Sequence, residues 1–196
     1  THGMRDLPPR QQTLRNTLAW SYNLLSREEQ RIFRRLAIFT GGSTVEAAEY
    51  VCGGKVRVLD ILTSLLEKNL LQRDSSPAGE PRLRMLETIR EYGHECLQAS
   101  NDYQDVQRLH STYYLLLAEE TASHLTGPEG LLWINRLRLE IDNIRQILSW
   151  WQTCGENENS LHLGSALRHF WVLSGHGREG YHWLINALTA SHDSAP

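Results

Sequence analysis

The side chains with the widest range of chemistry in this 196-residue chain are its nine histidines and three cysteines. His162 and His169 are seven residues apart in one helical pattern, about 10 Å, which is too far for one metal ion. Cys52, Cys96 and Cys154 lie in apolar helical patterns, where cysteine usually behaves as an inert small hydrophobe. We therefore predict neither a metal site nor a cysteine nucleophile, and we expect that the chain is not an enzyme.

Nucleotide phosphates would need a loop of the form Gly-x4-Gly-Lys-Ser/Thr, whose backbone N–H groups surround the phosphates. The Gly54-Lys55 pair is followed by Val56, and Glu49 stands at the position of the earlier glycine. The sequence therefore predicts no cofactor in this chain and no ATP hydrolysis by it alone.

Three arginines could touch DNA phosphates: Arg73, Arg82 and Arg84. Residues 82–85 alternate charged and apolar side chains, which is the pattern of a half-buried strand. Residues 70–73 form the expected partner strand, and residues 74–81 form the loop between the two. A helix followed by such a hairpin is the outline of a winged helix, and the three arginines are its candidate wing contacts.

The expected recognition helix covers residues 56–69, and its charges cancel. Its outward residues are expected to be Arg57, Asp60, Thr63, Ser64, Glu67 and Lys68. Asp74 and Glu80 also flank the wing arginines. DNA affinity comes largely from neutralised phosphates, so we do not expect this chain to bind DNA. A DNA-binding winged helix is the alternative.

The remaining first-half elements follow from caps and periodicity. Residues 11–25 form the expected first helix, and Ser26 with Glu29 makes a capping box for the second. Residues 37–39 are expected to form a short buried strand. Ser43 or Thr44 should cap a third helix that ends at Gly53, and a fifth helix is expected over residues 87–100. In the fourth helix the inward residues are expected to be Val58, Leu59, Leu62, Leu65 and Leu66.

Residues 101–196 are expected to contain helices only, over residues 102–125, 131–139, 160–173 and 178–190. A further expected helix carries Ile141, Ile144, Leu148 and Trp151 and ends before a turn at residues 154–157. In the helix over residues 102–125, the inward residues are expected to be Val106, Leu109, Tyr113, Leu116 and Leu117. Pairs of helices joined by short turns predict an array resembling tetratricopeptide (TPR) repeats. Adjacent Trp150 and Trp151 cannot both face one core. The tryptophans either fill gaps between helices or line a face for a partner, for which these two are the candidates.

The net charge of −3 is unevenly divided. Residues 1–100 carry 14 basic and 12 acidic side chains, whereas residues 101–196 carry 6 and 11. We therefore predict a winged-helix domain at 1–100 and a helical-repeat domain at 101–196, mainly α-helical overall. No apolar run reaches the roughly 20 residues of a membrane span. The odd number of cysteines favours reduced thiols and a cytoplasmic location.

Several segments together resemble one known family. They are LPPRQQTLRNTLAWSYNLLS from residue 7, EEQRIFRRLAIFTGG from residue 28, TVEAAEYVC from residue 44, LLEKNLL from residue 65, RMLETIREY from residue 84 and WINRLRLEIDNIRQILSW from residue 133. The chain resembles bacterial STAND (NB-ARC-like) signal-transduction ATPases of the transcriptional-regulator type. In that family an ATP- or ADP-binding NTPase domain precedes a winged helix and helical repeats, and this chain matches the last two parts.

The resemblance implies a regulatory role without catalysis. The upstream NTPase domain would be one partner, and a protein or small-molecule inducer on the repeats would be the other. Family members carry a Met-His-Asp motif whose histidine contacts ADP, and the matching positions here are Met85, Leu86 and Glu87. Leucine cannot donate a hydrogen bond to phosphate. We expect these three residues to serve packing, helix capping and interdomain contact.

Overall fold

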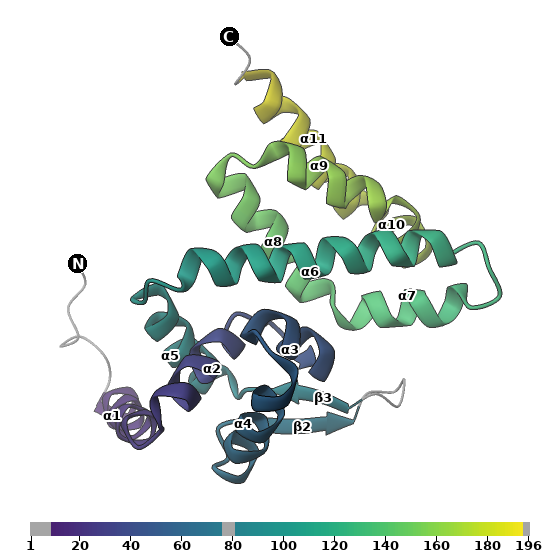
Figure 1. Ribbon diagram of the computed structural model, residues 1–196. Coiled ribbons are helices and arrows are strands. Elements are labelled where there is room, and N and C mark those ends of the chain that lie inside the picture. The colour runs from purple at the N-terminus through teal and green to yellow at the C-terminus, as the bar shows by residue number, and fades with distance from the viewer. Residues whose placement is uncertain (1–8, 76–80, 194–196) are drawn as a thin grey trace.

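The computed structural model describes residues 9–75 and 81–193. The first half contains five helices and a small sheet within this part of the chain (Figure 1). The helices are α1 (Pro9–Asn23), α2 (Arg27–Leu36), α3 (Val45–Cys52), α4 (Lys55–Glu67) and α5 (Glu87–Gln98). The strands are β1 (Ser43–Thr44), β2 (Gln72–Ser75) and β3 (Pro81–Arg84), paired antiparallel in the order β1-β3-β2. The predicted helix–hairpin outline is confirmed, but its strands cover residues 72–75 and 81–84 instead of 70–73 and 82–85.

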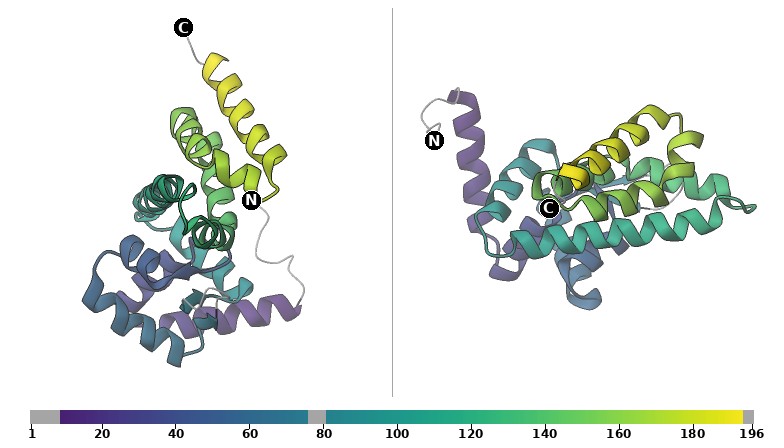
Figure 2. Two further views of the ribbon diagram at one scale, coloured as in Figure 1. Left: turned by 90° about the vertical axis from the view of Figure 1, so that its right-hand side faces the viewer. Right: turned by 90° about the horizontal axis from the view of Figure 1, so that it is seen from above.

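The second half is helical throughout its described part. Its helices are α6 (Tyr103–His124), α7 (Gly130–Leu139), α8 (Ile141–Cys154), α9 (Asn157–Ala166), α10 (Arg168–Leu173) and α11 (Gly177–Asp193). The long helix α6 lies between the winged-helix elements and α9–α11, as Figure 1 shows from the side and the left view of Figure 2 nearly end-on. No helix within the described ranges is both long and apolar enough to cross a membrane.

Local signals predicted the start of α2 and both ends of α3 correctly. The Ser26 side chain accepts a hydrogen bond from the Glu29 backbone N–H, and the Glu29 carboxylate accepts one from the Ser26 N–H. Thr44 caps α3 by accepting from the Ala47 N–H, and Gly53 ends that helix at a φ of 80°. The predicted capping box, N-cap and left-handed C-cap are therefore confirmed.

The short strand predicted at residues 37–39 is wrong. The N–H groups of Ile38 and Phe39 bond back to the carbonyls of Arg35 and Leu36, so the segment prolongs the helix as a buried turn. The strand begins later, at Ser43, after Gly42. A Cβ on Gly42 would lie 2.6 Å from the Leu83 carbonyl oxygen, which shows how closely the two strands approach there.

Two side chains predicted to face inward are instead exposed. Leu59 in α4 is 45% exposed, and Leu116 in α6 is 51% exposed. Both lie at the border of a helical apolar stripe, where the neighbouring elements decide burial.

The single helix predicted over 160–173 is divided in the structure, because Leu167 has a ψ of 1° and ends α9 before α10 begins.

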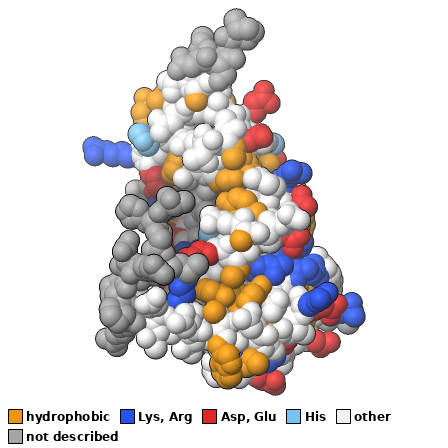
Figure 3. Space-filling view, turned by 90° about the vertical axis from the view of Figure 1, so that its left-hand side faces the viewer, with side chains coloured by type: hydrophobic (Ala, Val, Ile, Leu, Met, Phe, Trp, Pro, Cys, Tyr) orange, Lys and Arg blue, Asp and Glu red, His pale blue; other side chains and the backbone are white. Residues whose placement is uncertain are grey.

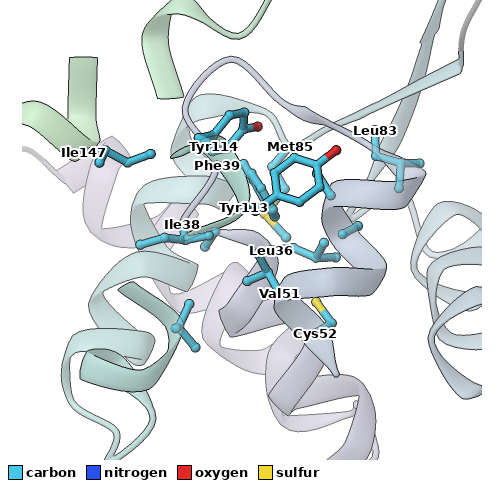
Figure 4. Close-up of a cluster of buried hydrophobic side chains, with 14 of the residues drawn as sticks. Leu36, Ile38, Phe39, Val51, Cys52, Leu83, Met85, Tyr113, Tyr114 and Ile147 are labelled. Carbon is cyan, nitrogen blue, oxygen red and sulfur yellow. The ribbon is translucent and has the colours of Figure 1, made fainter. Parts of the chain in front are cut away.

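One hydrophobic cluster runs through both halves of the chain. Figure 4 shows Tyr113 and Tyr114 of α6 and Ile147 of α8 among side chains of the winged helix, including Phe39 and Met85. The domain boundary at residue 100 and the repeat array remain predictions. Helices α9 and α11 do pack closely, since a Cβ on Gly164 would lie 2.6 Å from a Leu184 methyl group.

Candidate nucleic-acid interface

Helix α4 occupies the position of a recognition helix, and Arg57 within it and Lys68 at its C-cap are both paired with acids of α2. Arg57 Nη1 lies 2.9 Å from Glu28 Oε1, and both side chains are exposed. Lys68 Nζ contacts Glu29 Oε1. An acid beside each cation offsets the positive charge that a DNA phosphate would meet.

Glu29 is held by several donors at once. Besides capping α2, its carboxylate accepts a 2.6 Å hydrogen bond from Ser64 Oγ and contacts the Lys68 ammonium. The hydrogen bond from Lys68, followed by that from Ser64, lowers the pKa of Glu29 to about 2. The carboxylate is therefore ionised at neutral pH and joins the start of α2 to the end of α4.

The wing presents two arginines to solvent. Arg73 and Arg84 are both exposed, and neither forms an ion pair within residues 9–75 and 81–193. They line a shallow pocket of about 350 Å³ together with Gln72, Asp74, Leu86 and Glu87. The pocket therefore mixes both signs of charge. Glu80 lies outside the described residues.

Arg82 was predicted as a wing contact, and that prediction is wrong. Its side chain is 9% exposed and pairs through Nη1 with Glu140, whose side chain is 3% exposed. Its Nη2 donates at 3.2 Å to the carbonyls of Gly42 and of Leu139. The sheet alternation was correct, but the junction of α7 and α8 covers the face of β3 from which Arg82 extends.

Glu140 is the centre of this buried polar cluster. Its Oε2 accepts a 2.6 Å hydrogen bond from Tyr114 Oη and a 2.9 Å bond from Asn143 Nδ2. Asn143 also donates to the Gly42 carbonyl at 3.0 Å and accepts from the Thr40 N–H at 2.8 Å. Both carboxylate oxygens are satisfied, as a buried charge requires.

The cluster shifts the pKa values of its members. Burial alone would lower the pKa of Arg82, but the hydrogen bond and charge of Glu140 outweigh burial and raise it. Burial, reinforced by Glu140, raises the pKa of Tyr114 well above its usual value. Arg82 is therefore a cation and Tyr114 a neutral donor at physiological pH.

The candidate interdomain residues lie between β3 and α5. Met85 is buried in the core, whereas Leu86 is 50% exposed and occupies the N-cap position of α5. Glu87 begins the helix and pairs with Arg90 at 2.7 Å, which lowers the Glu87 pKa. Met85 thus packs as expected, and Leu86 and Glu87 lie at the surface beside the wing pocket.

The two adjacent tryptophans diverge as predicted. Trp151 is buried in the core, and Trp150 is half-buried. Both line a groove of about 400 Å³ between α6 and the α8–α9 segment, together with Gln104, Arg108, Ser111, Thr112, Leu115, Cys154, Glu156 and Asn159. A partner face at this groove remains a prediction.

The sequence reasoning missed Glu140, Tyr114 and Asn143. A signal was present, because Glu140 lies four residues before Ile144 on the buried stripe of α8. An acid on such a stripe either lies at the helix end in solvent or meets a buried cation. The sequence does not show that Arg82, 58 residues earlier, is that cation.

Comparison with known proteins supports this description of the first half. Residues 25–98 match the family model described as a winged helix-turn-helix domain. Three relatives, one from Mycobacterium bovis and two from strains of Mycobacterium tuberculosis, bear the name "Putative HTH-type transcriptional regulator". Each is 38% identical over 190 residues, which is 95% of this chain and 21% of the relative. No solved structure matches.

Proposed function

We propose that this chain is a regulatory and interaction module of a transcriptional regulator rather than its DNA reader or a catalyst. In the proposed mechanism, an upstream NTPase domain binds ATP or ADP and contacts the winged helix. An inducer binds the α6–α11 helices and shifts the balance between the resulting states. The names of the relatives support the transcriptional context, and the resemblance to STAND ATPases supports the relay.

The observation that carries the proposal is that cations of α4 and the wing, the elements that would face DNA, form ion pairs within the chain. Acids of α2 lie against Arg57 and Lys68, and Glu140 sequesters Arg82. A winged helix that reads DNA places a recognition helix in the major groove and uses several cations on phosphates. Here Arg57, Lys68 and Arg82 serve contacts within the chain, which leaves Arg73 and Arg84 as the exposed wing cations.

The thiols support a role without catalysis. Burial raises the pKa of Cys52 to about 12, and burial also raises the pKa of Cys96. A nucleophilic cysteine requires the opposite shift, because the thiolate is the reactive form. These two thiols are therefore suited to packing.

DNA binding is the second candidate, and one observation favours it. Arg73 and Arg84 lie exposed on adjacent strands, and the relatives are named as helix-turn-helix regulators. Fluorescence anisotropy with mixed-sequence duplexes at low salt separates the two functions. We expect no submicromolar binding.

Submicromolar binding that weakens steeply with salt would contradict the proposal if Arg73→Glu with Arg84→Glu abolished it. The matched control is Arg138→Glu with Arg168→Glu, which makes the same charge change at exposed positions of α7 and α10. Loss of binding in the control as well would indicate a general charge effect instead of a wing contact.

A further inference from the structure

The winged helix and the helical half meet at two places of different character. One is apolar, where α3 and the turn after α2 pack against α6 through rings such as Tyr50 on Tyr113 and Phe39 on Tyr114. The other is polar, where β3 and the loop before β1 meet the α7–α8 junction. The two contacts constrain the halves in different ways.

The apolar contact stabilises association without defining a unique orientation. Hydrophobic burial is non-directional and roughly proportional to area, so a small rotation of α6 on α3 changes it little. The ring pairs at this contact are tilted or edge-on, at centroid separations of 5.4 Å and 6.5 Å.

The polar contact is directional and has little tolerance for movement. Arg82 spans from its ion-pair partner Glu140 to the carbonyls of Gly42 and Leu139, while Asn143 binds Gly42 and Thr40. A shift of α8 relative to β3 would separate the buried guanidinium of Arg82 from the carboxylate oxygen of Glu140 that it pairs with. Breaking a buried ion pair by removing one partner typically costs about 3–5 kcal/mol.

We propose that the buried Arg82–Glu140 pair is an orientation lock that makes the winged helix and helices α6–α8 move as one rigid body. Arg82 and Glu140 are positioning residues here, and the inference stands whether or not the module relays a nucleotide state. A displacement of α8 would then be transmitted directly to β3 and its wing. Any partner that separates the halves must first extract Arg82 from the cluster.

Replacing Arg82, Tyr114 and Glu140 of this cluster with apolar side chains tests orientation separately from stability. The variant Arg82→Met, Tyr114→Phe and Glu140→Leu removes the ion pair. It also removes the Tyr114 hydroxyl, which would otherwise lose its acceptor. Such exchanges are often neutral in stability. Spin labels at Asp60→Cys in α4 and Ser149→Cys in α8, both exposed positions, report the distance between the halves. All labelled variants also carry Cys96→Ser and Cys154→Ser, so that the spin label reacts only at the introduced cysteines. Cys52 is kept because it is fully buried.

We expect one narrow distance distribution in the otherwise native chain. In the apolar variant we expect that distribution to broaden roughly twofold or to split, while the melting temperature stays within a few degrees. The matched control is Arg136→Met with Glu46→Leu, an ion pair of 3.0 Å that joins the same halves with Glu46 exposed. The control distribution should remain narrow.

An unchanged distribution in the apolar variant would overturn the proposal, as would equal broadening in the control. If the apolar variant does not fold, Glu140→Gln alone decides the question. It keeps an acceptor for Tyr114 and Asn143 but removes the charge that holds Arg82. A distribution as narrow as that of the native chain in Glu140→Gln would then show that the pair does not fix the orientation.

Discussion

At the scale of single residues, this chain uses charged and titratable side chains to hold its own elements. Glu29 caps α2 and joins it to the end of α4, and Glu140 joins the two halves of the chain. His110 is fully buried against Phe39 and Tyr114, and neither of its ring nitrogens has a hydrogen-bond partner in the described part of the chain. Two of these side chains lead to direct tests.

Glu29→Ala should lower the free energy of unfolding by about 1–2 kcal/mol, because it removes the reciprocal cap and also leaves Lys68 and Ser64 without their acceptor. Urea unfolding measures the change. The neighbouring Glu28→Ala is the control, since its ion pair with Arg57 is exposed and worth little. Equal losses in the two variants would contradict the special role of Glu29.

Stability should fall as the pH drops below about 6.5, and His110 should account for much of the loss. Burial lowers the pKa of His110 to about 3. Asn143 opposes this shift but does not cancel it, because its amide nitrogen already donates to Gly42 and Glu140. Between these pH values the unfolded chain binds a proton that the folded chain excludes. Each pH unit in that window then costs up to about 1.4 kcal/mol.

Urea unfolding at pH 7, 5 and 4 tests the role of His110. The variant His110→Phe should flatten the pH dependence between 6.5 and 4, because the group that titrates on unfolding is gone. His182→Gln, at an exposed position of α11, should leave the dependence unchanged. A parallel fall in the His110→Phe variant and the native chain would sink the assignment.

At the scale of elements, close backbone approaches define how the helices pack. The last two helices meet where a Cβ on Gly180 would lie 2.5 Å from Cγ of Trp171, a buried side chain. Surface charge is mixed over the face drawn in Figure 3, where hydrophobic side chains gather in separate groups with acidic and basic ones between them. The contact between α10 and α11 depends on the close fit of Gly180 against Trp171. Adding one methyl group at position 180 tests that fit.

Gly180→Ala should destabilise the chain by about 1–3 kcal/mol, because the added methyl group cannot fit beside the indole without moving it. The matched control in the same helix is Gly177→Ala, whose Cβ would meet nothing within 4 Å. That change should be neutral or slightly stabilising, since alanine has the higher helix propensity. Thermal melts of both variants make the comparison, and a stable Gly180→Ala would show that the packing is looser than described.

At the scale of the whole molecule, a single hydrophobic cluster joins the halves. It contains winged-helix residues such as Ile38 and Val51 together with Ile144 and Trp151 of α8. A shared core favours cooperative unfolding, because neither half keeps its buried surface when the other is lost.

Urea unfolding followed by far-ultraviolet circular dichroism and by tryptophan fluorescence should therefore give one midpoint. Five of the six tryptophans lie after residue 130, so fluorescence reports mainly on the second half. A fluorescence transition at a distinctly different urea concentration would instead support two independent domains divided near residue 100. In that case the shared cluster would not couple the halves energetically.

The features that could be predicted from the sequence are those that depend on neighbours a few residues away. The Ser26 and Glu29 box, the Thr44 cap and the Gly53 terminus were predicted correctly, as was the divergence of Trp150 and Trp151. Each follows from helical geometry or from one turn of backbone hydrogen bonds. The helix–hairpin outline of the winged helix followed from the same kind of local pattern.

The environments of the wing arginines depend on contacts between distant parts of the chain and could not be predicted. Arg82 and Arg84 share a strand and a face, yet Arg84 is exposed while Arg82 is buried against Glu140. The alternation of a strand assigns a side chain to a face, but it does not say what later covers that face. The covering helices lie more than fifty residues further along the chain, and their position depends on packing that no local pattern encodes.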